Sequence, residues 1–309
     1  APAITGLKSD TSVEFLPKPL WSKDKADYSF YRSFDIDGKF NIQELNYRQN
    51  SFSNTQTELS LNNGNLDIKS FSSDYLGGKL NADASLQMND RPIVSGKISL
   101  KGADTDSLNA GGSVYALKNG TFDFTSDFES VADSEFDFVS GLNGKAEFDF
   151  SNLNLKGWNL PNIYQDITKR EDPDGLSALV KENLLSGSTS FEHFKGSAQI
   201  SAGKITLNNA VMNNADSTIT LSGDGSLPEW SMNILFSAKY QEPQYLPGFA
   251  FSLKGQADSP LLDIDVSALY NLYKSRQNKK EADVKAAETA LKNHLTSLID
   301  NQKNAAKAL

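Results

Sequence analysis

Apolar residues stand at every second position over most of residues 34–266, and this alternation limits the chain to folds built from β-strands. Successive side chains of a strand point to opposite faces, so one face is apolar and the other polar. Turn residues such as Asn63-Gly64 and Asn119-Gly120 interrupt the runs, and Asn-Gly is a strong hairpin signal. We therefore predict a mainly β protein, an elongated antiparallel sheet of roughly sixteen short strands.

The apolar members of these runs would together form one continuous face, and they are the candidate functional residues of the chain. They are Phe40, Ile42, Leu59, Leu61, Leu66, Ile68, Leu80, Leu86, Ile98, Leu100, Phe122, Phe124, Phe148, Phe150, Ile200, Ile205, Leu207, Ile219, Leu221, Ile234, Phe236, Phe251, Leu253, Ile264 and Val266.

Two segments depart from the strand pattern. In the first, residues 161–187, the apolar residues have helical spacing that is split by Asp172-Pro173-Asp174-Gly175, which predicts helix, turn, helix. The second, residues 269–309, has no Gly or Pro, and its apolar residues are three and four positions apart, which predicts an amphipathic helix. We expect the first segment to divide the sheet into two parts. The predicted organisation is a lead-in at 1–33, a first half of the sheet at 34–160, a helical insertion at 161–187, a second half at 188–268 and a C-terminal helix at 269–309.

Composition excludes several classes of function. The 30 basic and 39 acidic residues give a net charge of −9, which argues against a nucleic-acid partner, because such partners are bound through neutralised phosphates. There is no cysteine, and the two histidines, His193 and His294, are far apart. We therefore expect no metal, no cofactor and no enzyme activity.

Acidic residues alternate with phenylalanines between Phe122 and Phe150, including Glu135 to Phe138. In strands, this alternation places acids and aromatic rings on opposite faces, so the acids are interpreted as a solvated face rather than as a glycosidase pair.

The predicted C-terminal helix differs in charge from the rest of the chain. Residues 269–309 hold eight basic and four acidic residues, a net charge of +4, against −13 for the remainder. Three roles fit such a helix: a cap on the end of the sheet, a coiled coil, or attachment to an anionic membrane surface.

The succession of these segments resembles the C-terminal region of the AsmA-like family of inner-membrane-anchored periplasmic proteins in diderm bacteria. The resemblance covers most of the chain. The segments that carry it are Trp21-Ser22-Lys23, Gly38 to Leu45, Leu61 to Ile68, Leu76-Gly77-Gly78-Lys79-Leu80, Leu117 to Phe124, Phe148 to Leu160, Ala202-Gly203-Lys204-Ile205, and Leu253 with Gly255, Ser259 and Pro260.

The resemblance implies a β-taco, a long antiparallel sheet folded into a half-open groove with an apolar inner face. It also implies a periplasmic protein that carries phospholipids between the envelope membranes and supports outer-membrane homeostasis. Anchoring to the inner membrane would use an N-terminal segment that is absent from this chain. Outer-membrane or other envelope proteins are further expected partners.

Shielding acyl chains requires a long apolar surface. Each exposed CH₂ costs about 0.8 kcal/mol, so a chain of about sixteen carbons costs on the order of 13 kcal/mol in water. Roughly sixteen strands spaced about 4.8 Å apart would give a face about 75 Å long. Two other functions remain open: a structural or adhesive β-solenoid with a closed core, and a scaffold that assists outer-membrane protein assembly through a strand edge.

Overall fold

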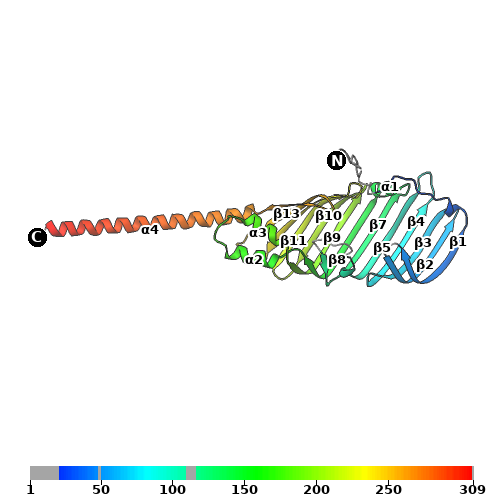
Figure 1. Ribbon diagram of the computed structural model, residues 1–309, viewed down its shortest axis with the longest axis horizontal. Helices are drawn as coiled ribbons and strands as arrows, with labels where there is room; N and C mark the ends of the chain where they lie inside the picture. Colours follow the sequence, from blue (N-terminus) through cyan, green and yellow to red (C-terminus); the bar gives the residue numbers. More distant parts are fainter. Residues whose placement is uncertain (1–20, 48–49, 109–115, 308–309) are drawn as a thin grey trace, which may run out of the picture.

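The computed structural model describes residues 21–47, 50–108 and 116–307, with side chains as far as residue 297 (Figure 1). It is dominated by one antiparallel sheet of fourteen strands. Thirteen of them lie side by side in chain order from β1 to β14, and the short β6 pairs with β8 outside this path. In the described residues, β1 and β14 form the two open edges. The predicted fold class is confirmed, with fewer strands than expected.

The strand bounds agree with the alternating runs. The strands are β1 (Ile36–Tyr47), β2 (Asn50–Asn62), β3 (Asn65–Tyr75), β4 (Gly78–Gln87), β5 (Ile93–Asp104), β6 (Ala116–Lys118), β7 (Thr121–Val131), β8 (Asn143–Lys156), β9 (Ser188–Ser201), β10 (Lys204–Asn213), β11 (Ser217–Ser226), β12 (Ser231–Tyr240), β13 (Phe249–Gln256) and β14 (Leu261–Asp265).

Irregular pairing bends the sheet. The register shifts on β3 after Ile68, on β5 after Leu100 and on β10 after Leu207, and β2 is irregular near Asn54, which has a positive φ of 52°. Such bulges kink a strand and increase its twist.

The helical insertion is confirmed as α2 (Leu160–Lys169) and α3 (Leu176–Asn183). The expectation that it divides the sheet is wrong. Strands β8 and β9, which flank the insertion in the chain, pair along their length, for example Phe148 with Gly196. The insertion therefore leaves the sheet continuous and lies at its edge (Figure 1).

The prediction that the alternating acids and phenylalanines between β7 and β8 lie in a strand is also wrong. Residues Glu135–Gly141 form a helix, α1, whose N-cap Ser134 accepts a hydrogen bond from the backbone N–H of Asp137 at 3.0 Å. Phe136 and Phe138 are therefore not part of the alternating strand faces. Phe138 instead packs edge-on against Phe128, with ring centroids 6.5 Å apart.

The described part of the lead-in, residues 21–35, follows one rim of the sheet and includes a short 3₁₀ turn, η1 (Phe30–Arg32). At its start, Trp21 Nε1 donates to the carbonyl of Leu227 at 2.8 Å, directly after β11. At its end, the Asp35 carboxylate accepts from the N–H of Asn63 at 3.0 Å, next to β2. The segment therefore ties together turns from nearly the whole length of the sheet. Residues 1–20 of the predicted lead-in lie outside the described part.

The C-terminal helix is confirmed as α4 (Ser267–Lys307), which leaves the β14 end of the sheet and extends away from it (Figure 1). Only its first turns enter the body of the protein, where Leu269 and Tyr273 are fully buried. Farther along, Val284, Leu291 and Leu295 are each at least half exposed.

Candidate functional site

The apolar residues of neighbouring strands meet in rows that cross the sheet. Paired residues of antiparallel strands share a face, so each row can be followed from strand to strand. One row runs from edge to edge through Phe40, Thr57, Phe71, Ala82, Ile98, Ser126, Ala146, Ala198, Leu207, Gly223, Ile234, Leu253 and Leu262. We call this side of the sheet the apolar face.

Parallel rows place the other candidate residues on the apolar face. Ile42 follows Phe40 by two positions, and Val266 follows Ile264 just beyond the end of β14. The rows hold Leu59, Ile68, Ile200 and Ile205; Leu61, Leu66 and Leu86; Leu80, Leu100, Phe124 and Phe148; Phe122, Phe150 and Ile219; and Leu221, Phe236, Phe251 and Ile264.

Exposure changes along the apolar face. Near the β14 end, Ile219 and Phe251 are 0% and 1% exposed. In the middle strands, Ile98 and Leu207 are half-buried, and at the β1 edge Phe40 is 41% exposed. The face is therefore closed at one end and accessible over the remaining strands.

Exceptions to this trend occur in both directions: Leu61, Leu100 and Phe122 are buried, whereas Ile234, Ile264 and Val266 are only partly buried although they pack against the cluster at the β14 end. The half-buried candidates are Ile42, Leu59, Leu66, Ile68, Leu80, Leu86, Phe124, Phe148, Phe150, Ile200, Ile205, Ile234, Ile264 and Val266.

Aromatic packing closes the β14 end. Trp158, which precedes α2, stands edge-on to Phe236 and Phe251 with centroid distances of 5.1 and 5.0 Å. Those two rings stack at 4.7 Å. The buried Ile163 of α2 and Val180 of α3 belong to the same cluster. The helices thus occupy the space that the apolar face leaves open elsewhere.

Two buried tyrosines hold α2 at this end. The Tyr240 hydroxyl donates to the Leu160 carbonyl at 2.8 Å, and the Tyr273 hydroxyl donates to the carbonyl of Ile167. Burial raises the pKa of both phenols, because the charged form would lose its hydration. These hydroxyls therefore satisfy helical carbonyls in an otherwise apolar cluster.

A phenylalanine cluster marks the middle of the apolar face. Phe122 and Phe150 stack at 5.2 Å, and Phe194 lies 4.9 Å from Phe148 and 5.4 Å from Phe150. The Phe148 ring lies over Gly196, where an added Cβ would come within 2.7 Å of it. Phe122 is buried, and Phe148 and Phe194 also pack against the buried cluster of the β14 end, so these rings join the half-buried middle of the apolar face to its closed end.

Several residues of the apolar face were not among those predicted, for example Phe71, Phe128 and Phe194. Phe71 follows the bulge on β3 and so breaks the alternation that ends at Ile68. A step of three between apolar residues, as at Ile68 to Phe71, was the signal that could have located it.

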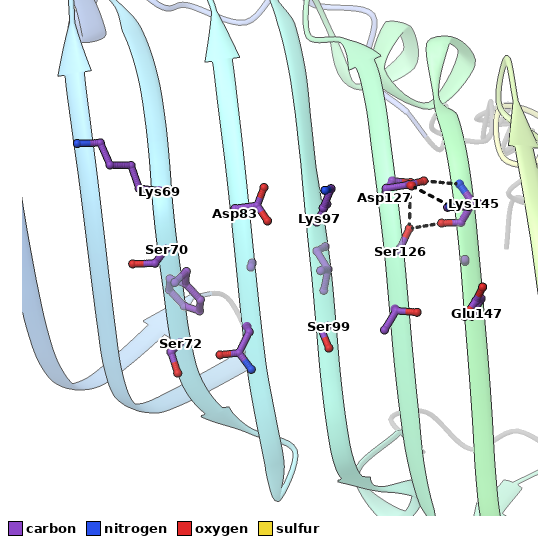
Figure 2. A pocket seen from close by; sticks show the side chains of 16 residues that line it. Lys69, Ser70, Ser72, Asp83, Lys97, Ser99, Ser126, Asp127, Lys145 and Glu147 are labelled. Carbon is purple, nitrogen blue, oxygen red and sulfur yellow. Dashed lines mark hydrogen bonds and ion pairs between the residues drawn. The ribbon is translucent and has the colours of Figure 1, made fainter.

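The opposite face of the sheet is charged. Lys39 pairs with Glu58 at 3.0 Å, and Lys145 pairs with Asp127 at 3.6 Å. Charged side chains of β3, β4, β5, β7 and β8, among them Lys69, Asp83 and Lys97, gather around a shallow cavity (Figure 2), whose volume is about 530 Å³. Phe71, Ala82 and Ile98 of the row described above line the same cavity, so its lining is mixed, with more apolar than polar surface.

Other kinds of site are not apparent in the part of the chain that the structure describes. Its buried side-chain nitrogens and oxygens all have hydrogen-bond partners, and no three His, Asp or Glu side chains are grouped to hold a metal ion. No helix within the same residues is long and apolar enough to cross a membrane. The apolar face is therefore the candidate functional site.

Comparison with known proteins gives one match. The family model described as the AsmA family matches residues 10–210, which include the accessible strands β1 to β9 and most of β10. No curated protein and no solved structure matches the chain. The family match covers about two thirds of the chain, and AsmA proteins are associated with the bacterial cell envelope. The chain therefore belongs to the AsmA family.

Proposed function

We propose that the protein binds the acyl chains of phospholipids on its apolar face and carries them through the periplasm between the envelope membranes. The observation that carries this proposal is the series of half-buried apolar residues across consecutive strands. A sheet that closed on its own core would bury these side chains. Here they remain within reach of a ligand that brings its own apolar surface.

The opposite face supports the same proposal. Its charged and polar side chains keep the outside of the sheet in water, while the apolar face shelters the lipid tails. Transfer of acyl chains onto such a face removes CH₂ groups from water and gains about 0.8 kcal/mol for each. No reacting group is needed, so the proposed activity is not enzymatic.

The closed end defines how lipids would lie. Trp158 and helices α2 and α3 fill the apolar face at β11 to β13. Acyl chains would therefore occupy the region from β1 to β10, with their headgroups toward the open side of the bent sheet. Anchoring to the inner membrane and contact with outer-membrane proteins are further parts of the proposal and rest on family membership.

The test compares two neighbouring residues of β4 that differ in the face they occupy. Ala82 is half-buried on the apolar face, and Asn81 is exposed on the polar face. In the first assay, the purified protein is incubated with a fluorescent phosphatidylethanolamine and the bound fluorescence is measured. In the second assay, lipid that co-purifies with the protein is measured by native mass spectrometry. We expect Ala82→Asp to reduce lipid binding at least tenfold and Asn81→Asp to leave it unchanged.

Thermal unfolding by circular dichroism controls for loss of the fold in each variant. Absence of lipid from the unaltered protein in both assays would contradict the proposal. Equal binding by the two variants would contradict the assignment to the apolar face.

A further inference from the structure

A separate cavity lies at the closed end of the sheet, where the start of α2 meets the turn between β10 and β11. Its volume is about 330 Å³, which is large enough for a small molecule or a headgroup. It shares no lining residue with the shallow cavity of Figure 2, and the proposed function makes no use of it.

The floor of this cavity is apolar and aromatic. Leu160 of α2 and Tyr240 of β12 are buried there, and Tyr164 of α2 is half-buried above them. The rings of Tyr164 and Tyr240 have centroids 5.0 Å apart and are tilted by 55° to each other. Aromatic rings of this kind accept CH₂ and CH₃ groups and attract cations to their faces.

The mouth of the cavity is negatively charged. Asp216 and Glu242 line it and are both exposed. Among the residues that the structure describes, neither carboxylate has an ion pair or a hydrogen-bond partner. The described lining includes no basic residue, whereas Lys69, Lys97 and Lys145 line the cavity of Figure 2. The two negative charges are therefore not compensated within the site, which favours a cation over an anion.

The walls of the cavity are held in place by hydrogen bonds. The backbone N–H of Asp216 donates to the side-chain oxygen of Asn214 at 3.0 Å, and the Asp216 carbonyl accepts from the N–H of Gln241 at 2.8 Å. Across the cavity, the Tyr240 hydroxyl donates to the Leu160 carbonyl at 2.8 Å. The site is thus formed before a ligand arrives, and little ordering is needed on binding.

We propose that this cavity binds an alkylammonium group, the charged end of molecules such as choline and ethanolamine. The carboxylates of Asp216 and Glu242 neutralise its charge, and the Tyr164 ring contacts its carbon atoms. A metal ion fits the site less well, because the described residues contain no group of three His, Asp or Glu side chains that could hold one. This inference stands whether or not the apolar face binds acyl chains.

The first experiment measures binding of free ligands by saturation-transfer NMR. The unaltered protein is titrated with choline, with ethanolamine and with the neutral alcohol in which a carbon atom replaces the choline nitrogen. We expect both amines to bind in the millimolar range. The neutral alcohol should bind at least tenfold more weakly than choline, because it has the same shape and lacks the charge that the carboxylates neutralise.

Variants assign this binding to the cavity. Asp216→Asn/Glu242→Gln keeps the shape of both side chains and should weaken choline binding at least tenfold. Tyr164→Leu should weaken it severalfold, because the aromatic face is lost. The matched control is Glu182→Gln, which changes an exposed carboxylate of α3 outside the cavity and should leave choline binding unchanged. Circular dichroism melts confirm that each variant is folded.

Fluorescent phospholipids identify the source of the ammonium group. If it belongs to a lipid headgroup, the double variant binds less phosphatidylethanolamine and the same amount of phosphatidylglycerol, which has no ammonium. If it belongs to a free amine, both lipids bind the double variant as they bind the unaltered protein. Choline binding without binding of either lipid would support this site and contradict the proposed function.

Three results would overturn the proposal: no binding of either amine by the unaltered protein, equal binding of choline and the neutral alcohol, or unchanged choline binding by the double variant.

Discussion

At the scale of single residues, two phenylalanines of the apolar face have opposite environments. Phe251 is 1% exposed and stacks on Phe236, whereas Phe40 is 41% exposed at the β1 edge. Truncation of a buried aromatic ring removes its packing and leaves a cavity. We predict that Phe251→Ala lowers the free energy of unfolding by about 3–5 kcal/mol. The matched Phe40→Ala variant should lower it by less than about 1 kcal/mol in urea titrations.

Similar losses at the two sites would show that the β1 end is packed as tightly as the β14 end. That outcome would contradict the difference in exposure on which the proposed function depends.

The buried phenol of Tyr240 should make stability depend on pH. Burial raises its pKa in the folded protein above the ordinary value, so the unfolded chain releases this proton first as pH rises. The contribution to stability is complete below about pH 10 and is lost above it, by about 1.4 kcal/mol for each pH unit. In urea titrations between pH 8 and 11, the free energy of unfolding of Tyr240→Phe should fall less with rising pH than that of the unaltered protein.

At neutral pH the same variant should be less stable by about 1 kcal/mol, because the hydrogen bond to the Leu160 carbonyl is lost. An identical pH dependence in both proteins would show that Tyr240 ionises as freely in the folded state as in the unfolded chain.

At the scale of elements, α4 divides into an anchored start and an exposed rod. Leu269 and Tyr273 are buried in the closed end, whereas side chains from residue 278 to 297 are exposed. A chain ending at Gln277 should therefore unfold within about 2 °C of the unaltered protein, since little packing is removed. Leu269→Ala should lower the unfolding temperature by several degrees, because about 2–4 kcal/mol of packing is lost. A large loss on truncation would place the helix against the body of the protein.

The strands, α2 and α3 could be predicted because their apolar positions follow their burial. Helix α4 could be predicted because its sequence has no Gly or Pro and spaces apolar residues three and four apart, although most of these residues are exposed. Helix α1 was missed because Glu135 to Phe138 alternates as a strand does, although Ser134 and Asp137 have the spacing of a helix cap. The β8 to β9 pairing was missed because alternation carries no information about which strands are neighbours.

At the scale of the whole molecule, the apolar face could be predicted from the sequence but its shape could not. Every candidate residue lies on that face, because a period of two fixes the face directly. The closed end was not predicted, because it depends on Trp158 and the helices folding back over β11 to β13. The bulges were not predicted either, because in the sequence a bulge changes only the phase of the alternation between apolar and polar residues. The twelve steps between thirteen adjacent strands make the sheet about 58 Å long, shorter than the predicted 75 Å.

The central claim is that acyl chains lie against the apolar face between β1 and β10. Its most direct test places a photo-crosslinking amino acid at Ile98 and Leu207 on that face, and at their strand neighbours Lys97 and Thr206 on the polar face. The proteins are illuminated with a radiolabelled phospholipid, and the lipid-protein adduct is quantified after denaturing electrophoresis. We predict strong adducts at Ile98 and Leu207 and at most a tenth as much at Lys97 and Thr206. No adduct at any position, or equal adducts on both faces, would contradict the account.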